Sequence, residues 1–275
     1  TAAGVGFLAG CGVLEVPVYR RPRVAVIATG SELVPPSEVP GPGKIRNSNS
    51  YAMAACAREA GAEAHMLPIV QDTFEALRDA VAQAAREYDF VVTTGGAANG
   101  DFDFIKPVVA ELGELLMTTV NMRPGKAQTF GIVEGTPVFG LPGNPAAAYV
   151  GFQMLIRPAL RTMQGYRFMD HPVVKARLTA DEKNRDPRRI YLRANLTRTA
   201  EGYEVTPAKN QSSGLFGPIQ RPTAWPSCPR APSLNLRAPI VDCLLLDIPE
   251  EVVSRRSHDH QIRHHHVLRY PHFGN

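Results

Sequence analysis

Acidic side chains follow three apolar runs that are typical of buried strands. Glu32 comes shortly after the run 24–28, and Asp72 comes after the run 64–69. Asp101 and Asp103 follow the third run, 90–94. Carboxylate oxygens together with retained waters are the ligands that Mg²⁺ prefers, so these side chains are candidates for binding a divalent cation.

Each of these carboxylates also has a purely structural interpretation. Glu32 could be a solvated loop residue. Asp72 could cap a helix that begins at Thr73, and Asp103 could cap a helix that opens at Phe104, because Asp is a favoured N-cap residue. From residue type and spacing alone, both interpretations stay open.

Glycine-rich segments end two of the same runs. Thr94-Gly95-Gly96-Ala97-Ala98-Asn99-Gly100 lies between a strand pattern and a helix pattern, where backbone N–H groups can be laid on an anion. Thr29-Gly30-Ser31 ends the first run; its glycine lets a ligand approach the backbone, and Ser31 could bind a phosphate or cap a helix. These segments predict a site for a phosphate-bearing ligand.

Two further segments could hold an anion. Arg123-Pro124-Gly125-Lys126 offers a forked guanidinium and a point charge, although a solvated basic turn is the alternative. In Leu141-Pro142-Gly143-Asn144-Pro145, the proline near the first helical position predicts a helix N-terminus free to face an anion. No Ser–His–Asp order, Cys–His pair or zinc spacing indicates covalent catalysis.

Strand and helix patterns alternate through the first two thirds of the chain. We predict helices over 48–60, 73–87, 105–112 and 145–163, and a hairpin of 128–133 with 137–141. This order predicts an α/β fold: a mostly parallel sheet with helices on both faces. Ligands in such folds bind beyond the carboxyl ends of the strands, where the candidate loops would converge.

The pattern changes after Gly165. Short alternating segments predict a small all-β domain over 170–253, after the α/β domain over 20–166. The stretch 221–239 is rich in proline, and we interpret it as a long loop or as a segment translated out of frame. The tail 254–275 is rich in His and Arg, and we expect it to be disordered.

Charge and composition exclude several classes of protein. The net charge of +4, from 30 basic and 26 acidic residues, is too small to predict nucleic-acid binding. No apolar run approaches the ~18 residues of a membrane span. The four cysteines have no metal-binding spacing, which favours free thiols in a reducing cytoplasm.

The order of these motifs resembles that of the molybdopterin molybdotransferases, the bacterial MoeA proteins and the C-terminal domain of gephyrin. Asn47-Ser48-Asn49 and Val70-Gln71-Asp72 add to the segments quoted above. The resemblance covers about residues 1–253. It implies a MoaB/Mog-like α/β domain followed by a β domain. It also implies that the sequence is truncated at its N-terminus, with 1–19 as the remnant of a preceding domain.

The resemblance implies a role in molybdenum cofactor biosynthesis, as a cytoplasmic transferase. Molybdate would be inserted into adenylylated molybdopterin with release of AMP, assisted by Mg²⁺. A homodimer and an adenylyltransferase partner are further implications. By motif position the catalytic residues would be Glu32, Asp72 and Asp103, with the metal at Glu32 and Asp103. The ligand-binding residues would be Thr29, Gly30, Ser31, Thr94, Gly95, Gly96, Gly100, Arg123, Lys126, Pro142, Gly143 and Asn144.

The sequence departs from the family's pattern in two places. Ala98 stands where a hydroxyl residue is common, and Thr119 stands where some members have a basic residue. Two other functions therefore stay open. One is a molybdopterin adenylyltransferase-like enzyme, against which the β domain argues. The other is a non-catalytic pterin-binding or scaffold domain, which would bind the pterin without turnover.

Overall fold

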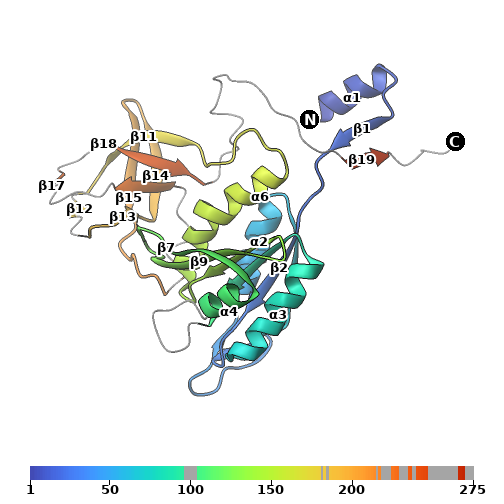
Figure 1. Cartoon of the computed structure of the whole chain (residues 1–275). Helices are drawn as coiled ribbons and strands as arrows, with labels where there is room; N and C mark the ends of the chain where they lie inside the picture. Colours follow the sequence, from blue (N-terminus) through green and yellow to red (C-terminus); the bar gives the residue numbers. More distant parts are fainter. Residues whose placement is uncertain are drawn as a thin grey trace.

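The computed structural model of the chain describes residues 1–95, 104–180, 182–183, 186–214, 216–217, 224–228, 235–236, 240–246 and 266–269. Gly96, Gly100 and Asp103 lie outside this described part, as does the tail 254–275 apart from 266–269. Figure 1 shows an α/β part beside a β-rich part.

A six-stranded sheet forms the centre of the α/β part. Its order is β5-β2-β6-β10-β9-β7; the first four strands are parallel, and β9 and β7 are antiparallel additions at one edge. Continuous apolar runs build β2 and β6, which are buried because helices cover both faces. The strands are β5 (Glu63–Met66), β2 (Arg23–Ala28), β6 (Phe90–Thr94), β10 (Thr136–Leu141), β9 (Ala127–Val133) and β7 (Gly113–Thr119).

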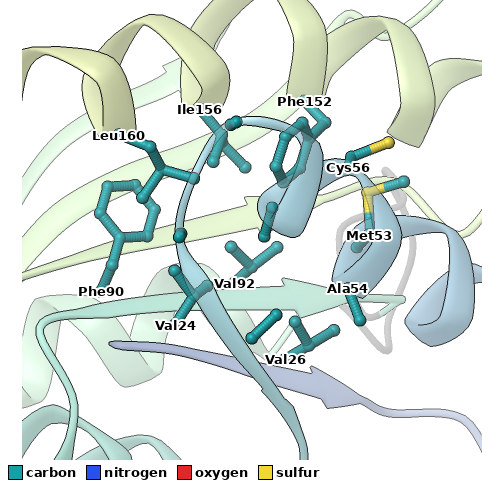
Figure 2. Close-up of a cluster of buried hydrophobic side chains, with 14 of the residues drawn as sticks. Val24, Val26, Met53, Ala54, Cys56, Phe90, Val92, Phe152, Ile156 and Leu160 are labelled. Carbon is teal, nitrogen blue, oxygen red and sulfur yellow. The ribbon is translucent and has the colours of Figure 1, made fainter. Parts of the chain in front are cut away.

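Helices cover both faces of this sheet, as predicted (Figure 1). On one face α2 (Asn49–Glu59) packs with a continuous helix formed by α5 (Pro145–Gly151), the π-helical turn η1 (Phe152–Ile156) and α6 (Arg157–Met163). Figure 2 shows this cluster, in which Met53 and Phe152 contact the strands. On the other face lie α3 (Phe74–Glu87) and α4 (Ile105–Leu112).

The β-rich part is a seven-stranded sheet of order β14-β15-β11-β18-β16-β13-β8. Its last strand, β8 (Met122–Arg123), comes from the α/β part and pairs parallel with β13. The other strands are β11 (Val173–Leu178), β13 (Arg189–Tyr191), β14 (Ala194–Thr199), β15 (Gly202–Pro207), β16 (Ala224–Cys228) and β18 (Ile240–Leu245).

Short elements complete the described chain. The two-residue strands β3 (Leu33–Val34) and β4 (Ile45–Arg46) pair with each other, as do β12 (Glu182–Lys183) and β17 (Asn235–Leu236). Helix α1 (Ala2–Gly10) precedes β1 (Glu15–Val18), which pairs with β19 (His266–Arg269). This pairing differs from the disorder predicted over 254–275.

The prediction of a Pro-rich loop over 221–239 is wrong for two short segments. Residues 224–228 form β16, which lies between β13 and β18, and 235–236 form β17. The side chain of Trp225 on β16 is fully buried. Loop-like composition was overridden here by pairing on both sides of β16.

The two parts share a hydrophobic cluster. Met122 and Val150 from the α/β part pack with Tyr191, Trp225 and Leu244 from the β-rich part. This packing fixes how the loops of the two parts meet. No helix in the described residues is long and apolar enough to cross a membrane.

Candidate functional site

The carboxyl ends of β2 and β5 bring two predicted acidic residues together, Glu32 after β2 and Asp72 after β5. The hydroxyl of Thr29, just after β2, donates a hydrogen bond to Asp72 Oδ1 at 3.3 Å. The carboxylate of Glu32 folds back over Gly30, where an added Cβ would lie 2.7 Å from both of its oxygens. Burial raises the pKa of Asp72, and the nearby charge of Glu32 raises it further, while the Thr29 hydrogen bond lowers it. Glu32 and Asp72 therefore form an acidic pair.

Two structural interpretations of this region are wrong. Thr73, not Asp72, caps α3, since its side chain accepts the Ala76 N–H at 3.3 Å. Ser31 caps no helix: it lies in a turn before β3, and its carbonyl accepts a hydrogen bond from Lys44 Nζ at 2.6 Å. Asp72 is thus available to a ligand or a cation.

The acidic pair is compatible with Mg²⁺, which commonly takes one or two carboxylates together with phosphate oxygens and waters. The described residues contain no group of three or more His, Cys, Asp or Glu placed to hold a metal ion. Asp103, the other predicted metal ligand, lies outside the described residues.

A pocket of about 350 Å³ opens beside Glu32 of this pair, where the α/β part meets the β-rich part, whereas Asp72 lines a separate pocket. We call it the junction pocket. It gathers the end of β2, the start of α2, the end of β6, the start of α5 and a segment of the β-rich part. Its lining residues are Thr29, Glu32, Leu33, Ile45, Arg46, Asn47, Ser48, Asn49, Thr94, Gly95, Gly143, Asn144, Pro145, Gly214 and Phe216.

Close backbone approach explains one glycine of the pocket. Gly95 has φ +90°, and a Cβ there would lie 2.1 Å from the carbonyl oxygen of Thr29. Gly143 lies on the other side of Gly95, with 3.7 Å between its ideal Cβ position and Gly95 Cα. Side-chain bulk at position 95 is therefore incompatible with the way the two strand ends meet.

The start of α5 differs from the prediction. The N–H of Ala146 donates to the carbonyl oxygen of Ser213 in the β-rich part at 2.9 Å, so this N–H is not free for an anion. Asn144 precedes the helix and makes no side-chain capping bond. Pro142 is buried behind the pocket rather than in its wall.

The predicted basic turn lies outside the junction pocket. Arg123 and Lys126 are both exposed, and neither is among the lining residues. Arg123 donates to Asp186 in the β-rich part at 3.2 Å, across a turn that contains a cis Arg123–Pro124 bond. The turn packs on α5, since the ideal Cβ position of Gly125 is 3.2 Å from the carbonyl oxygen of Ala147.

One buried cation of the β-rich part was not predicted from the sequence. Arg193 is 2% exposed, and its Nε and Nη2 have no hydrogen-bond partner in the described part of the chain. Burial lowers the pKa of Arg193, and the positive charge of Arg123 lowers it further. The effect of Arg123 indicates that two guanidinium groups, one from each part, lie near each other, and no carboxylate among the described residues pairs with Arg193.

The segment that anchors Arg193 also reaches the junction pocket. The side chain of Gln211 accepts the N–H of Arg193 at 3.0 Å and donates to its carbonyl oxygen at 2.9 Å. Gly214, three residues later, lines the pocket. An unpaired buried charge is unfavourable, so a bound oxyanion would stabilise Arg193. Its apolar neighbours Leu192 and Ala194 were the signal of burial in the sequence.

Comparisons with known proteins identify the fold's relatives. The family model described as "Probable molybdopterin binding domain" matches residues 25–162, and the model described as "MoeA C-terminal region (domain IV)" matches 175–221. The chain is 35% identical over 244 residues to the molybdopterin molybdenumtransferase of Staphylococcus epidermidis, covering 88% of this chain and 58% of that protein. It is 38% identical over 211 residues to that of Staphylococcus aureus strain COL, covering 76% and 50%.

A solved structure agrees with these matches. The molybdopterin biosynthesis MoeA protein from Pyrococcus horikosii superposes with a TM-score of 0.75 at 31% identity, over 88% of this chain and 59% of that one. The chain thus spans little more than half the length of the relatives it matches. These findings confirm the predicted fold class and the resemblance. The chain belongs to the MoeA-like family of molybdopterin molybdotransferases.

Proposed function

We propose that this chain carries the site at which molybdate is inserted into adenylylated molybdopterin, with release of AMP. The observation that supports this most directly is the buried guanidinium of Arg193, whose Nε and Nη2 have no partner among the residues that the structure describes. A tetrahedral dianion such as molybdate presents several oxygens to forked N–H donors, and guanidinium groups suit such recognition. Arg123 lies close enough for its charge to lower the pKa of Arg193.

The acidic pair and the junction pocket complete the proposed site. Glu32 and Asp72 would hold Mg²⁺, and by motif position Asp103 would join them. Bound Mg²⁺ would neutralise charge on the phosphoanhydride. The junction pocket, with Gly95, would hold the pterin and nucleotide. Hydrolysis of a phosphoanhydride coupled to oxyanion transfer needs charge neutralisation rather than a covalent intermediate.

We also propose a cytoplasmic location and a dimeric assembly for the protein. Cys56 and Cys243 are buried and form no disulfide in the described part of the chain, which is compatible with a reducing cytoplasm. A homodimer and an adenylyltransferase partner rest on the family resemblance alone. Light scattering of the purified chain would test the dimer, which a monomeric mass at micromolar concentration would contradict.

The test of the proposed function has two steps on one sample. Binding of adenylylated molybdopterin is measured by calorimetry, and AMP release is then measured after molybdate and Mg²⁺ are added. Binding followed by molybdate-dependent release supports the proposal. Binding without release would instead support a non-catalytic pterin-binding domain, and the absence of binding to folded chain would contradict the assignment of the site.

A further inference from the structure

Two asparagines at the start of α2 line the junction pocket and differ in their hydrogen bonds. Asn47 is satisfied at both ends of its amide: its Oδ1 accepts the Ser50 N–H at 3.2 Å, and its Nδ2 donates to Ser50 Oγ at 3.0 Å. Asn49 is satisfied at one end only. Its Nδ2 donates to the carbonyl oxygen of Gly143 at 2.9 Å, while its buried Oδ1 has no partner among the described residues.

The bond to Gly143 determines which end of the Asn49 amide is the carbonyl. Only the NH₂ group can donate to a backbone carbonyl, so Oδ1 must be the unpartnered acceptor. Asn49 is 9% exposed, so its Oδ1 does not lie on an open surface where bulk water would donate a hydrogen bond to it. Leaving such an acceptor unsatisfied is unfavourable, and a hydrogen-bond donor on a ligand would remove this penalty.

The chemistry of an acceptor restricts which part of a ligand it can meet. Molybdate and ionised phosphate groups offer only acceptor oxygens, and a carbonyl oxygen does not bind them. The donor must therefore be an uncharged group of the ligand, such as a ring amino group or a sugar hydroxyl. Leu33, Ile45 and Phe216 also line the pocket and supply apolar surface, which suits a flat ring.

We infer that Asn49 is a specificity-determining residue whose Oδ1 accepts a hydrogen bond from the exocyclic amino group of a bicyclic heterocycle. This inference rests on the proposed function, whose ligand contains two such rings, adenine and pterin. Asn49 selects a ring that carries the amino group and directs the uncharged end of the ligand into the junction pocket. The anionic end is then left to cations outside the pocket walls, such as Arg193.

The experiment measures binding of two matched ligand pairs by calorimetry. The pairs are AMP with purine riboside 5′-monophosphate, and 6-hydroxymethylpterin with the lumazine in which oxygen replaces the amino group. For the ring whose amino group donates to Asn49, the wild-type chain should bind the amino ligand about tenfold more tightly than the ligand that lacks this group. This ratio is expected for one net hydrogen bond. The pair whose two members bind with different affinities shows whether Asn49 contacts the adenine or the pterin.

Variants separate recognition from a structural role. In Asn49→Ala the two members of the pair should bind equally, whereas a merely structural role would weaken both and leave their ratio unchanged. Asn49→Asp keeps an acceptor oxygen but loses the donor to the Gly143 carbonyl, so it should keep the ratio while it weakens the binding of both ligands. Asn195→Ala, an exposed asparagine on β14, is the control for handling and folding.

The failure of this inference is distinct from the failure of the proposed function. Ligands that bind the wild-type chain without any preference for the amino group would overturn the role of Asn49 alone. A folded chain that binds none of the four ligands, and does not bind adenylylated molybdopterin, would overturn both.

Discussion

Arg193 carries a charge that its surroundings in the described chain do not neutralise. Without an anion, burial of an unpaired guanidinium destabilises the fold, so Arg193→Met should leave the free protein as stable as the wild type or more stable. With molybdate at 100 times its Kd, the wild type should gain about 2.7 kcal/mol, and the variant should gain little or nothing. Thermal unfolding with and without molybdate measures both effects.

The control for this prediction is Arg198→Met, which removes an exposed arginine from β14. It should keep the full stabilisation by molybdate. If Arg193→Met is destabilised in the absence of anion and still responds to molybdate, then Arg193 has a structural partner and is not the oxyanion ligand.

Asp72 is also a partly buried charge that its surroundings disfavour, but here the charge is negative. Its pKa is raised in the folded chain, so the native state takes up the proton first, and stability should rise as the pH falls through that raised pKa. Asp72→Asn should remove this pH dependence and stabilise the free protein at neutral pH, because Asn can still accept the Thr29 hydrogen bond. AMP release should lose its dependence on Mg²⁺ concentration. Asp79→Asn, an exposed carboxylate on α3, should change neither property.

The candidate site was predictable where chemistry follows directly from strand ends. Glu32 and Asp72 each follow an apolar run, and parallel strands bring such positions to one edge. Arg193 was not predictable in the same way. Its proposed role depends on its lack of a neutralising group among the described residues and on the position of Arg123 in the other part, and neither follows from the sequence. The sequence marks Asn49 only as part of the motif Asn47-Ser48-Asn49. The two asparagines differ in their side-chain hydrogen bonds, and this difference exists only in the folded chain.

At the scale of elements, the crossing of two loops at Gly95 determines the shape of the site. Gly95 and Gly135 have similar positive φ values, +90° and +83°, so alanine at either position meets the same backbone strain, about 1–2 kcal/mol. Only Gly95 also meets an atom, the Thr29 carbonyl oxygen. Gly95→Ala should therefore lower the free energy of unfolding clearly more than Gly135→Ala does in urea titrations. Equal losses would show that the loops relax without cost.

Elements with strong patterns were predicted well, and weakly marked ones were not. The runs that form β2 and β6, the amphipathic α3 and the hairpin of β9 with β10 all match the predictions. Strand β7 was missed because it follows α4 directly, with only Gly113 to mark the change. Strand β8 is two residues long and exists because β13 of the β-rich part pairs with it.

At the scale of the whole molecule, His171 links the two parts. Its Nε2 lies 3.0 Å from Oε1 of Gln153 in η1, and it precedes the first strand of the β-rich part. Burial, and then the charge of Arg157, lower its pKa to about 4. Between pH 6.5, the ordinary pKa of histidine, and pH 4, only the unfolded chain takes up this proton. The free energy of unfolding should therefore decrease as the pH is lowered through that window.

The measurement for His171 is the free energy of unfolding at a series of pH values. His171 should contribute a slope of up to about 1.4 kcal/mol per pH unit between pH 6.5 and 4. His171→Gln should lose this contribution, whereas His65→Gln, at a histidine whose side chain is 40% exposed, should keep it. A slope unchanged by His171→Gln would mean that His171 is already protonated or solvated in the native chain.

The cluster that joins the two parts should make them unfold together. Trp225, the single tryptophan, is fully buried in this cluster and has Tyr149 of α5 edge-on at 5.7 Å. Its fluorescence therefore reports on the junction, while far-UV circular dichroism reports mainly on the helices of the α/β part. We expect both signals to change at the same urea concentration.

A change in the cluster tests this coupling from the side of the α/β part. Val150→Ala removes two buried methyl groups from α5 beside Trp225 and should cost about 2 kcal/mol. Because the cluster belongs to both parts, both transitions should shift together, whereas Val39→Ala at an 81% exposed position should shift neither. If the fluorescence transition alone moves to lower urea, the junction opens before the α/β part unfolds. The site between the parts would then exist only while the junction is closed.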